Sequence, residues 1–299
     1  MEITIDRNPT VRPRDSYQTR AWRFVRRWPV VPAFLLAVLL ITGLLAPVIA
    51  PKDPNESNLR ARNASPIWYP DGSATHLLGA DHLGRDVVSR VIYGARFSLL
   101  FASLVISIST VIGVPYGMVS GYFGGWLDEG MMRVVDVIFA LPLILLGLAL
   151  VVVFGQRLDV LIGLLAMFSW PGTARQVRAG TLSLKTKDYV LAARISGAST
   201  SRILFRHILP GVVSTVLVLT TLSVGGLILT EAILSFLGAG VPPSIPAWGL
   251  MVADGRNYLT TAWWASFFPG LAIVLTVTGF NFLGDWLRDF FDPRLRQRA

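Results

Sequence analysis

The segment DYVLAARISGASTSRILFRHILPG, residues 188–211, is a polar stretch inside a strongly apolar chain. It carries three arginines and one histidine between two long apolar runs. Its leucines and alanines favour helix, and Ser199 can cap a second helix because a serine oxygen accepts from free N–H groups of a first turn. We therefore predict two short helices that bend at Gly197, the second running from about residue 200 to 209 and ending at Pro210.

The rest of the chain has the composition of a membrane protein. Of its 299 residues, 53% are hydrophobic and 15% are charged, whereas soluble domains carry roughly 25% charged residues. The first apolar run is longer than the core of a signal peptide, so we interpret it as an uncleaved helix. We predict an all-α polytopic membrane protein with six transmembrane helices. The predicted spans are residues 29–50, 97–120, 131–154, 158–174 with a kink at Pro171, 212–237 and 264–284.

Basic residues are concentrated in two segments. Residues 1–28 hold seven Arg against three acidic residues, and residues 175–210 hold seven Lys and Arg against one acidic residue. Because Lys and Arg accumulate in cytoplasmic loops, both termini and the opening segment are predicted to be cytoplasmic, with the two short helices parallel to the membrane surface. This topology accounts for the net charge of +9 without a nucleic-acid partner.

The predicted loop between the first two spans is long and contains HLLGADHLGRDVVSRVIYGAR, residues 76–96. Two interpretations stay open: an ordered extracytoplasmic loop stabilised by local ion pairs, or a loop for substrate entry or partner docking. His76 and His82 alone are too few ligands for a metal site, so no metal is expected. The candidate residues of this loop are Gly79, Asp81, Gly84, Arg85 and Asp86.

Ionisable residues inside predicted spans are costly to insert and therefore candidates for function. Glu231 either lines a polar translocation path, or it hydrogen-bonds a neighbouring helix or caps a break near Gly238 and Gly240. Asp136 could pair with Arg133 one turn away, which indicates a structural role. The candidates for a translocation path are Glu231, Ser235 and Asn281.

Enzyme motifs are missing from the sequence. It contains no G-x-x-x-x-G-K-[ST] phosphate loop, no H-E-x-x-H pair and no G-x-S-x-G elbow. We therefore expect no catalytic residues and no ATP site of its own. The opening segment is either a docking surface, with small residues on one face and Arg202 and Arg206 as a basic stripe, or a basic loop that only anchors the topology.

The opening segment resembles the cytoplasmic loop of ATP-binding-cassette importer permeases. LAARISG (191–197) and ILFRHILP (203–210) match the family pattern, although Leu191 stands where the family usually has Glu. Four further blocks resemble the oligopeptide, dipeptide and nickel subgroup, and within it the second permease of the pair, which has the long first loop. These blocks are HLLGADHLGRDVVSRVIYGARFSL (76–99), GYFGGWLDEGMMRVVDVIFALP (121–142), EAILSFLGAGVPPSIPAWG (231–249) and FNFLGDWLRDFFDPRL (280–295).

The resemblance implies the importer permease fold and a set of partners. These are a second homologous permease in a heterodimer, two ATP-binding-cassette ATPases and an extracytoplasmic substrate-binding protein, in the lipid bilayer of a bacterial inner membrane. No cofactor is expected on this chain, because the partner subunits would use the ATP. The ATPase-contact residues implied are Ala192, Ala193, Arg194, Gly197, Ala198, Ser199, Arg202, Ile203, Arg206, His207 and Pro210.

Peptides are the substrate that the resemblance favours, with nickel chelates, opines and oligosaccharides as alternatives. An ion-coupled carrier, a channel or a membrane scaffold is less supported, because the spans hold few buried charges. The expected organisation is a cytoplasmic tail (1–28), the first helix with its outer loop (29–95), a five-helix transport core (96–287) with the coupling loop 186–210, and a cytoplasmic tail (288–299).

Overall fold

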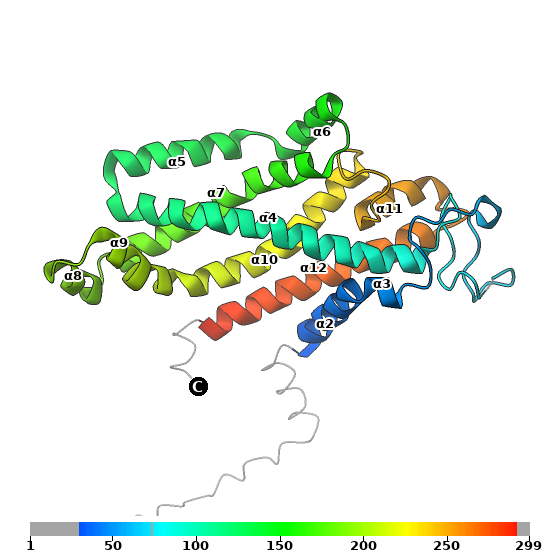
Figure 1. The fold of residues 1–299 in the computed structure, drawn as a ribbon, viewed down its shortest axis with the longest axis horizontal. Helices are drawn as coiled ribbons and strands as arrows, with labels where there is room; N and C mark the ends of the chain where they lie inside the picture. Colours follow the sequence, from blue (N-terminus) through cyan, green and yellow to red (C-terminus); the bar gives the residue numbers. More distant parts are fainter. Residues whose placement is uncertain (1–29, 73, 292–299) are drawn as a thin grey trace, which may run out of the picture.

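The computed structural model describes residues 30–72 and 74–291, and within these ranges the chain is helical, with no β-strand beyond an isolated bridge. The predicted tail 1–28 and most of the predicted tail 288–299 lie outside the described residues. Four long helices lie side by side in the centre of the molecule (Figure 1). They are α4 (Val87–Phe123), α7 (Leu158–Leu184), α10 (Leu209–Phe236) and α12 (Trp264–Phe291).

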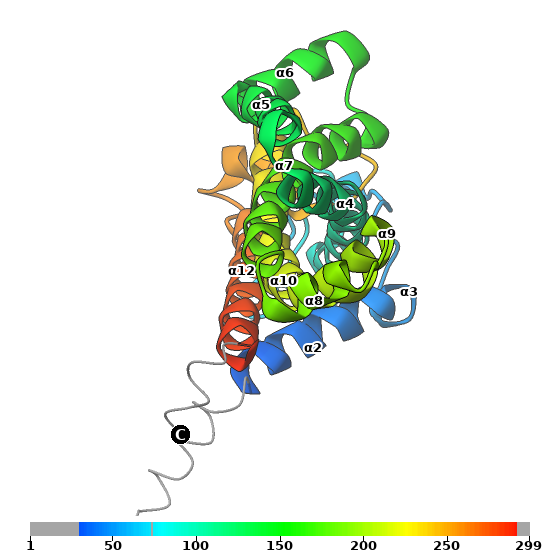
Figure 2. The ribbon, with the colours of Figure 1, turned by 90° about the vertical axis from the view of Figure 1, so that its left-hand side faces the viewer.

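Shorter helices cover the flanks and the two ends of this bundle. Seen along the bundle, α5 and α6 lie on one flank and α2 lies on the other (Figure 2). The helices α8 and α9 lie at one end, and α11 lies with the 50–86 loop at the opposite end (Figure 1). Their bounds are α2 (Val30–Leu44), α3 (Ala46–Ile49), α5 (Gly125–Ala140), α6 (Leu143–Phe154), α8 (Asp188–Ile195), α9 (Thr200–Ile203) and α11 (Trp248–Gly255), with single 3-10 turns at Leu59–Ala61 and Arg256–Tyr258.

The helix lengths do not confirm the count of six spans. Among the described residues, three helices are long and apolar enough to cross a membrane: Val87–Phe123, Thr200–Phe236 and Trp264–Phe291. The predicted third span, 131–154, is two helices, α5 and α6, bent by 72° at their junction, and this pair could form a fourth crossing. The bend lies at Pro142, because a proline disfavours the helical conformation of the residue before it.

The helix α4 begins ten residues before the predicted start at residue 97. Its N-cap is Asp86, whose carboxylate accepts a hydrogen bond of 2.8 Å from the backbone N–H of Ser89. A capped first turn satisfies a donor that would otherwise be unpaired, so the last ten residues of the predicted loop, 87–96, are helical. The apolar pattern alone indicates only the membrane-embedded part of this helix.

Close contact between α4 and α7 depends on glycine. A Cβ atom added at Gly117 would lie 2.3 Å from the backbone oxygen of Ala174. Small residues one turn apart allow two backbones to approach in this way, and Gly113 and Gly121 make similar contacts with α7. Gly226 of α10, in contrast, has no heavy atom within 4 Å of such a Cβ, and it lines a cavity described below.

The expected helix stop at Pro210 is wrong. The chain is helical from Thr200 to Phe236, and it passes through Pro210 by way of a π-helical turn at Leu204–Ile208. Proline lacks an N–H group, and its ring crowds the carbonyl four residues earlier. The wider π turn directly before Pro210 accommodates both effects, so α9 and α10 form one bent element.

Candidate functional site

The opening segment forms a helix, a turn and a second helix at one end of the bundle. The first helix, α8, ends at Ile195 with Ser196 as its C-cap, and Gly197 follows in the left-handed region with φ +78°. Glycine adopts this conformation at little steric cost. The Ser199 side chain then accepts a hydrogen bond of 3.4 Å from the backbone N–H of Arg202. The predicted bend at Gly197 and the cap at Ser199 are both confirmed.

One side of this segment anchors it to the bundle. Val190, Leu204 and Ile208 are buried in a cluster that includes residues of α4 and α7. Ile203, one of the residues expected to contact an ATPase, belongs to the same cluster and is only 1% exposed. Ile203 therefore holds the segment to the bundle rather than presenting a side chain to a partner.

The same segment also exposes large apolar side chains together with basic ones. Ile195 is 88% exposed and Phe205 is 63% exposed, and Arg194, Arg202 and Arg206 of the segment are exposed as well. We call these five residues the coupling face. Exposed apolar groups of this size gathered with arginine are typical of a protein interface.

The two apolar residues of the coupling face were missed at the sequence level. The indication available from the sequence was that neither side chain falls on the face of its short helix that the buried residues occupy. The other predicted contact residues flank the face: Ala192, Gly197, Ser199 and Pro210 are exposed, and Ala193, Ala198 and His207 are half-buried.

Two cationic side chains, one in this segment and one at the end of α7, contact the end of α4. The guanidinium of Arg194 lies 5.4 Å from the centroid of the Tyr122 ring, in a cation–π contact. Lys185 Nζ donates to the backbone oxygen of Gly121 at 2.7 Å. A lysine at a helix C-terminus satisfies free carbonyls and complements the helix dipole. These contacts fix the segment and the end of α7 against the end of α4.

Ion pairs join α5 to α7 along the same half of the molecule. Arg178 donates two hydrogen bonds of 2.5 Å to the carboxylate of Asp128. Asp136 pairs with Arg175 of α7 at 2.7 Å, not with Arg133 as the sequence indicates. The pairing across helices prevails because the backbones of α5 and α7 lie next to each other.

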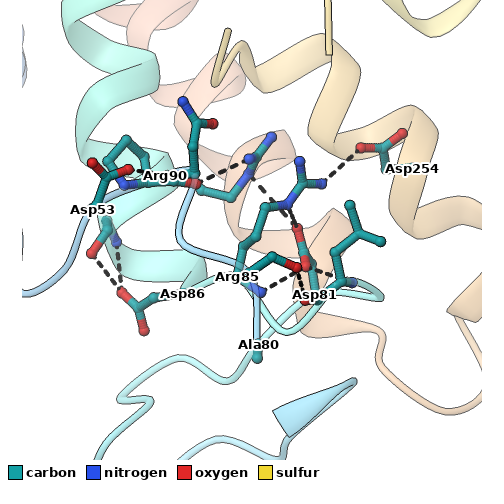
Figure 3. Close-up of polar contacts among 12 residues, drawn as sticks. Asp53, Ala80, Asp81, Arg85, Asp86, Arg90 and Asp254 are labelled. Atoms are coloured by element: carbon teal, nitrogen blue, oxygen red, sulfur yellow. Dashed lines mark hydrogen bonds and ion pairs between the residues drawn. The ribbon is translucent and has the colours of Figure 1, made fainter. Parts of the chain in front are cut away.

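The outer loop is held by a buried charge network at the other end of the bundle (Figure 3). Arg85 Nε donates to Asp81 at 2.7 Å, which confirms the predicted local ion pair. Its Nη2 atom lies 3.2 Å from the carboxylate of Asp254 in α11, a contact that sequence spacing could not indicate. Arg90, fully buried, donates to the backbone oxygen of Pro54 at 3.1 Å. The network therefore ties the loop to both α4 and α11.

Two glycines bring this loop close to its neighbours. Gly79 and Gly84 have φ values of +84° and +73°, and a Cβ at Gly84 would lie 1.8 Å from the Asn58 backbone oxygen. His76 Nδ1 lies 3.3 Å from the carboxylate of Asp86, whereas the His82 ring stacks on the ring of Tyr258. The two histidines thus have different partners, and no group of three metal-ligand side chains occurs within residues 30–72 and 74–291. These contacts support the interpretation as an ordered loop.

Two of the three candidates for a translocation path, Glu231 and Ser235, lie together on α10, and Asn281 lies on another helix, α12. Glu231 is buried, and its carboxylate accepts a hydrogen bond of 2.6 Å from Ser235, which lies one turn later on the same helix, α10, rather than on a neighbouring helix. Ser235 lines a cavity of about 430 Å³ together with His82. Asn281 is exposed on α12 beside Gly225 of α10.

A different cavity, of about 270 Å³, lies between α4, α6, α7 and α10. Seven hydroxyl side chains line it, and the sequence analysis singled out none of them. The only available signal was the recurrence of serine and threonine in otherwise apolar spans. They are Ser109, Thr110, Ser169, Thr173, Thr220, Ser223 and Thr230.

Comparisons with known proteins agree with this architecture. A chain of the MetNI methionine ABC transporter, in an inward-facing conformation, superposes with a TM-score of 0.56 at 20% identity, covering 68% of this chain and 97% of that one. The similar proteins include the dipeptide transport system permease protein DppC of Bacillus subtilis, 39% identical over 96% of this chain and 88% of that protein. They also include the glutathione transport system permease protein GsiD of Pectobacterium atrosepticum, 42% identical over 95% of this chain and 94% of that protein.

The family model for the inner membrane component of binding-protein-dependent transport systems matches residues 113–297. The match covers more than half of the chain, from the last third of α4 onwards, and it includes the coupling face and the residues of α6, α7 and α10 that line the cavity. The chain therefore belongs to the family of inner membrane components of binding-protein-dependent transport systems.

Proposed function

We propose that this chain is the permease subunit of an ATP-driven importer that moves di- or oligopeptides into the cytoplasm. The peptide substrate is supported by its relatives, which include dipeptide, oligopeptide and glutathione transport permeases. Separate ATPase subunits would engage residues 188–210, a second homologous permease would complete the pathway, and a binding protein would deliver the peptide.

The coupling face is the single observation that supports this proposal most. It places exposed Ile195 and Phe205 together with arginines, on a segment whose buried residues pack against α4 and α7. A partner that closes on this face would push a segment that is packed firmly against α4 and α7, rather than a loosely attached loop. Such a movement can select between two membrane conformations if the partner makes different contacts in each.

The proposed orientation places α8, α9 and the end of α12 in the cytoplasm. Figure 1 shows these three elements on the same side of the bundle, opposite the outer loop and α11. The binding protein would then approach the end that carries the Arg85 network. This assignment agrees with the excess of basic residues in the segment 175–210.

Substitution of Gly197 by glutamate is expected to lower ATP-driven peptide uptake about tenfold, as for the loss of one strong interface contact. A side chain at φ +78° strains the turn, and a carboxylate placed beside the coupling face would obstruct a partner. Uptake of a radiolabelled dipeptide by cells that depend on this chain measures the effect. Membrane levels of the variant should equal those of the wild type.

Gly155→Glu is the matched control for this experiment. Gly155 also has a positive φ, +74°, and open space around its Cβ position, but it lies in the turn between α6 and α7. A side chain at residue 155 causes the same backbone strain, but it does not lie beside the coupling face. Equal uptake by the two variants would contradict the assignment of residues 188–210 as the ATPase contact.

A further inference from the structure

The cavity between α4, α6, α7 and α10 is lined by seven hydroxyl side chains, which we call its polar wall, and by five large apolar side chains, which we call its apolar wall. None of the residues that line it, in the part of the chain that the structure describes, carries a charge. Its apolar wall consists of Ile106, Leu143, Leu165, Phe168 and Leu227. A site of this kind is chemically selective only through its hydroxyl groups and through the size of its apolar wall.

Four of these hydroxyl groups use their single hydrogen on their own helix. Each donates to a backbone oxygen three or four residues earlier, at 2.6 to 3.0 Å. A hydroxyl group has one donor and two acceptor lone pairs, so each of the four retains acceptor capacity but no donor for a solute in the cavity. These four residues are Ser169, Thr220, Ser223 and Thr230.

A fifth and a sixth hydroxyl group share one hydrogen bond. Ser109 Oγ and Thr173 Oγ1 lie 3.3 Å apart, so one of the two donates to the other. At most one donor of this pair is left for a solute. The polar wall is therefore rich in acceptors and poor in donors.

Back-bonding of serine and threonine is common in membrane helices, and alone it indicates no binding site. Thr221 shows this: it donates to the Leu217 backbone oxygen at 2.8 Å, as Thr220 does at 3.0 Å. Thr220 lines the hydroxyl-lined cavity, whereas Thr221 is not among the lining residues. The cavity is distinctive because seven hydroxyl groups from three helices, four of them with their donor already used, face one common space.

We propose that this cavity is a transit site that accepts hydrogen-bond donors of the solute, namely amide N–H and ammonium groups, and that disfavours carboxylates and other anions. An ammonium group offers three donors, whereas a carboxylate offers acceptors only and would meet acceptor oxygens. A polar group that loses water without gaining a partner is penalised, so the two ends of a peptide are treated differently. The proposal rests on the proposed function, because it takes the solute to be a peptide.

Thiol labelling tests this charge preference directly, because the natural chain contains no cysteine. The variants Thr230→Cys and Thr221→Cys are introduced separately into the complete importer in membrane vesicles. Each is treated with a cationic or an anionic methanethiosulfonate reagent, with and without ATP, and the mass of the purified chain reports the extent of labelling. Reaction rates are divided by those of the same reagents with 2-mercaptoethanol.

At Thr230→Cys, we expect the ratio of the labelling rate of the cationic reagent to that of the anionic reagent to exceed the same ratio for free 2-mercaptoethanol about tenfold in at least one nucleotide state. A tenfold change corresponds to about 1.4 kcal/mol. Thr221→Cys should show no such preference. A ratio equal to that of the free thiol, a ratio that favours the anionic reagent, or no labelling at Thr230→Cys in either state would overturn the proposal.

The double variant Thr220→Val and Thr230→Val supplies a second readout. It removes two acceptors with little change of volume, so transport of a dipeptide at saturating loaded binding protein should fall threefold or more, as when a hydrogen-bond partner is lost. Thr221→Val should transport normally. Normal transport by the double variant would overturn the transit site and leave peptide import intact, whereas the absence of ATP-driven peptide uptake by the wild type would refute the proposed function itself.

Discussion

Replacing Ile195 and Phe205 together by aspartate is expected to abolish association with the ATPase subunits and, with it, ATP-driven uptake. Both side chains are largely exposed in the free chain, so the substitutions remove no buried contact of the fold. In a complex they would form the apolar centre of an interface surrounded by arginines. Central apolar residues of an interface contribute about 2 kcal/mol or more each, which amounts to at least a 100-fold loss for two.

Co-purification of the ATPase subunits with the tagged permease measures this effect, and dipeptide uptake measures its consequence. Leu59→Asp is the control, because Leu59 is also exposed, at 70%, but lies in the outer loop at the opposite end of the bundle. It should leave ATPase association unchanged. Normal association by the double aspartate variant would show that the coupling face is not the ATPase contact.

Replacing Arg85 by methionine is expected to cause the largest loss of stability among single substitutions in the outer loop. The change removes the common partner of Asp81 and Asp254 and leaves the buried Asp81 carboxylate near Arg90 alone, at 3.8 Å. Removing one member of a buried ion pair costs about 3–5 kcal/mol. The loop should then detach from α11 and become accessible to protease.

Thermal unfolding of the purified permease and tryptic cleavage of the 51–86 loop report these two effects. Arg157→Met is the matched control, since Arg157 also pairs with an aspartate, Asp159, at 2.6 Å, but both side chains are more than half exposed. Exposed pairs contribute at most about 1 kcal/mol. Equal unfolding temperatures for the two variants would contradict the structural role of the buried network.

Local features of the opening segment were predictable from sequence. The cap at Ser199 and the turn at Gly197 depend on the residue itself and its neighbours in the chain, so residue type is sufficient to locate them. The continuation of the helix through Pro210 was not predictable, because it depends on a π turn whose geometry is set by packing. Residue type therefore indicates where a helix can end, whereas tertiary packing determines whether the helix ends there.

Contacts between distant residues were beyond sequence analysis. Arg85 and Asp254 are 169 positions apart, and nothing in either neighbourhood indicates the other. Asp136 illustrates the opposite case, since a partner one turn away is available in Arg133, yet the structure pairs Asp136 with Arg175 across two helices. Predicting either pair requires the arrangement of the helices, which a single sequence does not contain.

The hydroxyl-lined cavity was missed for a related reason. Serine and threonine recur in many membrane helices, and only the helix arrangement separates those that face a common space from those that do not. Thr220 and Thr221 are neighbours of the same type with the same backbone acceptor, yet only Thr220 lines the cavity. Glu231 drew attention because of its charge, but it is buried beside Ser235 and is not among the residues that line this cavity.

Peptide uptake by reconstituted proteoliposomes tests the central claim most directly. The vesicles contain this chain with its partner permease and the two ATPase subunits, and a labelled dipeptide is supplied on its binding protein. We predict that the peptide accumulates only when ATP is present on the side of the ATPase subunits and that accumulation stops when these subunits are omitted. Equal accumulation without the ATPase subunits would show that the chain is a self-sufficient carrier or channel and would contradict the account.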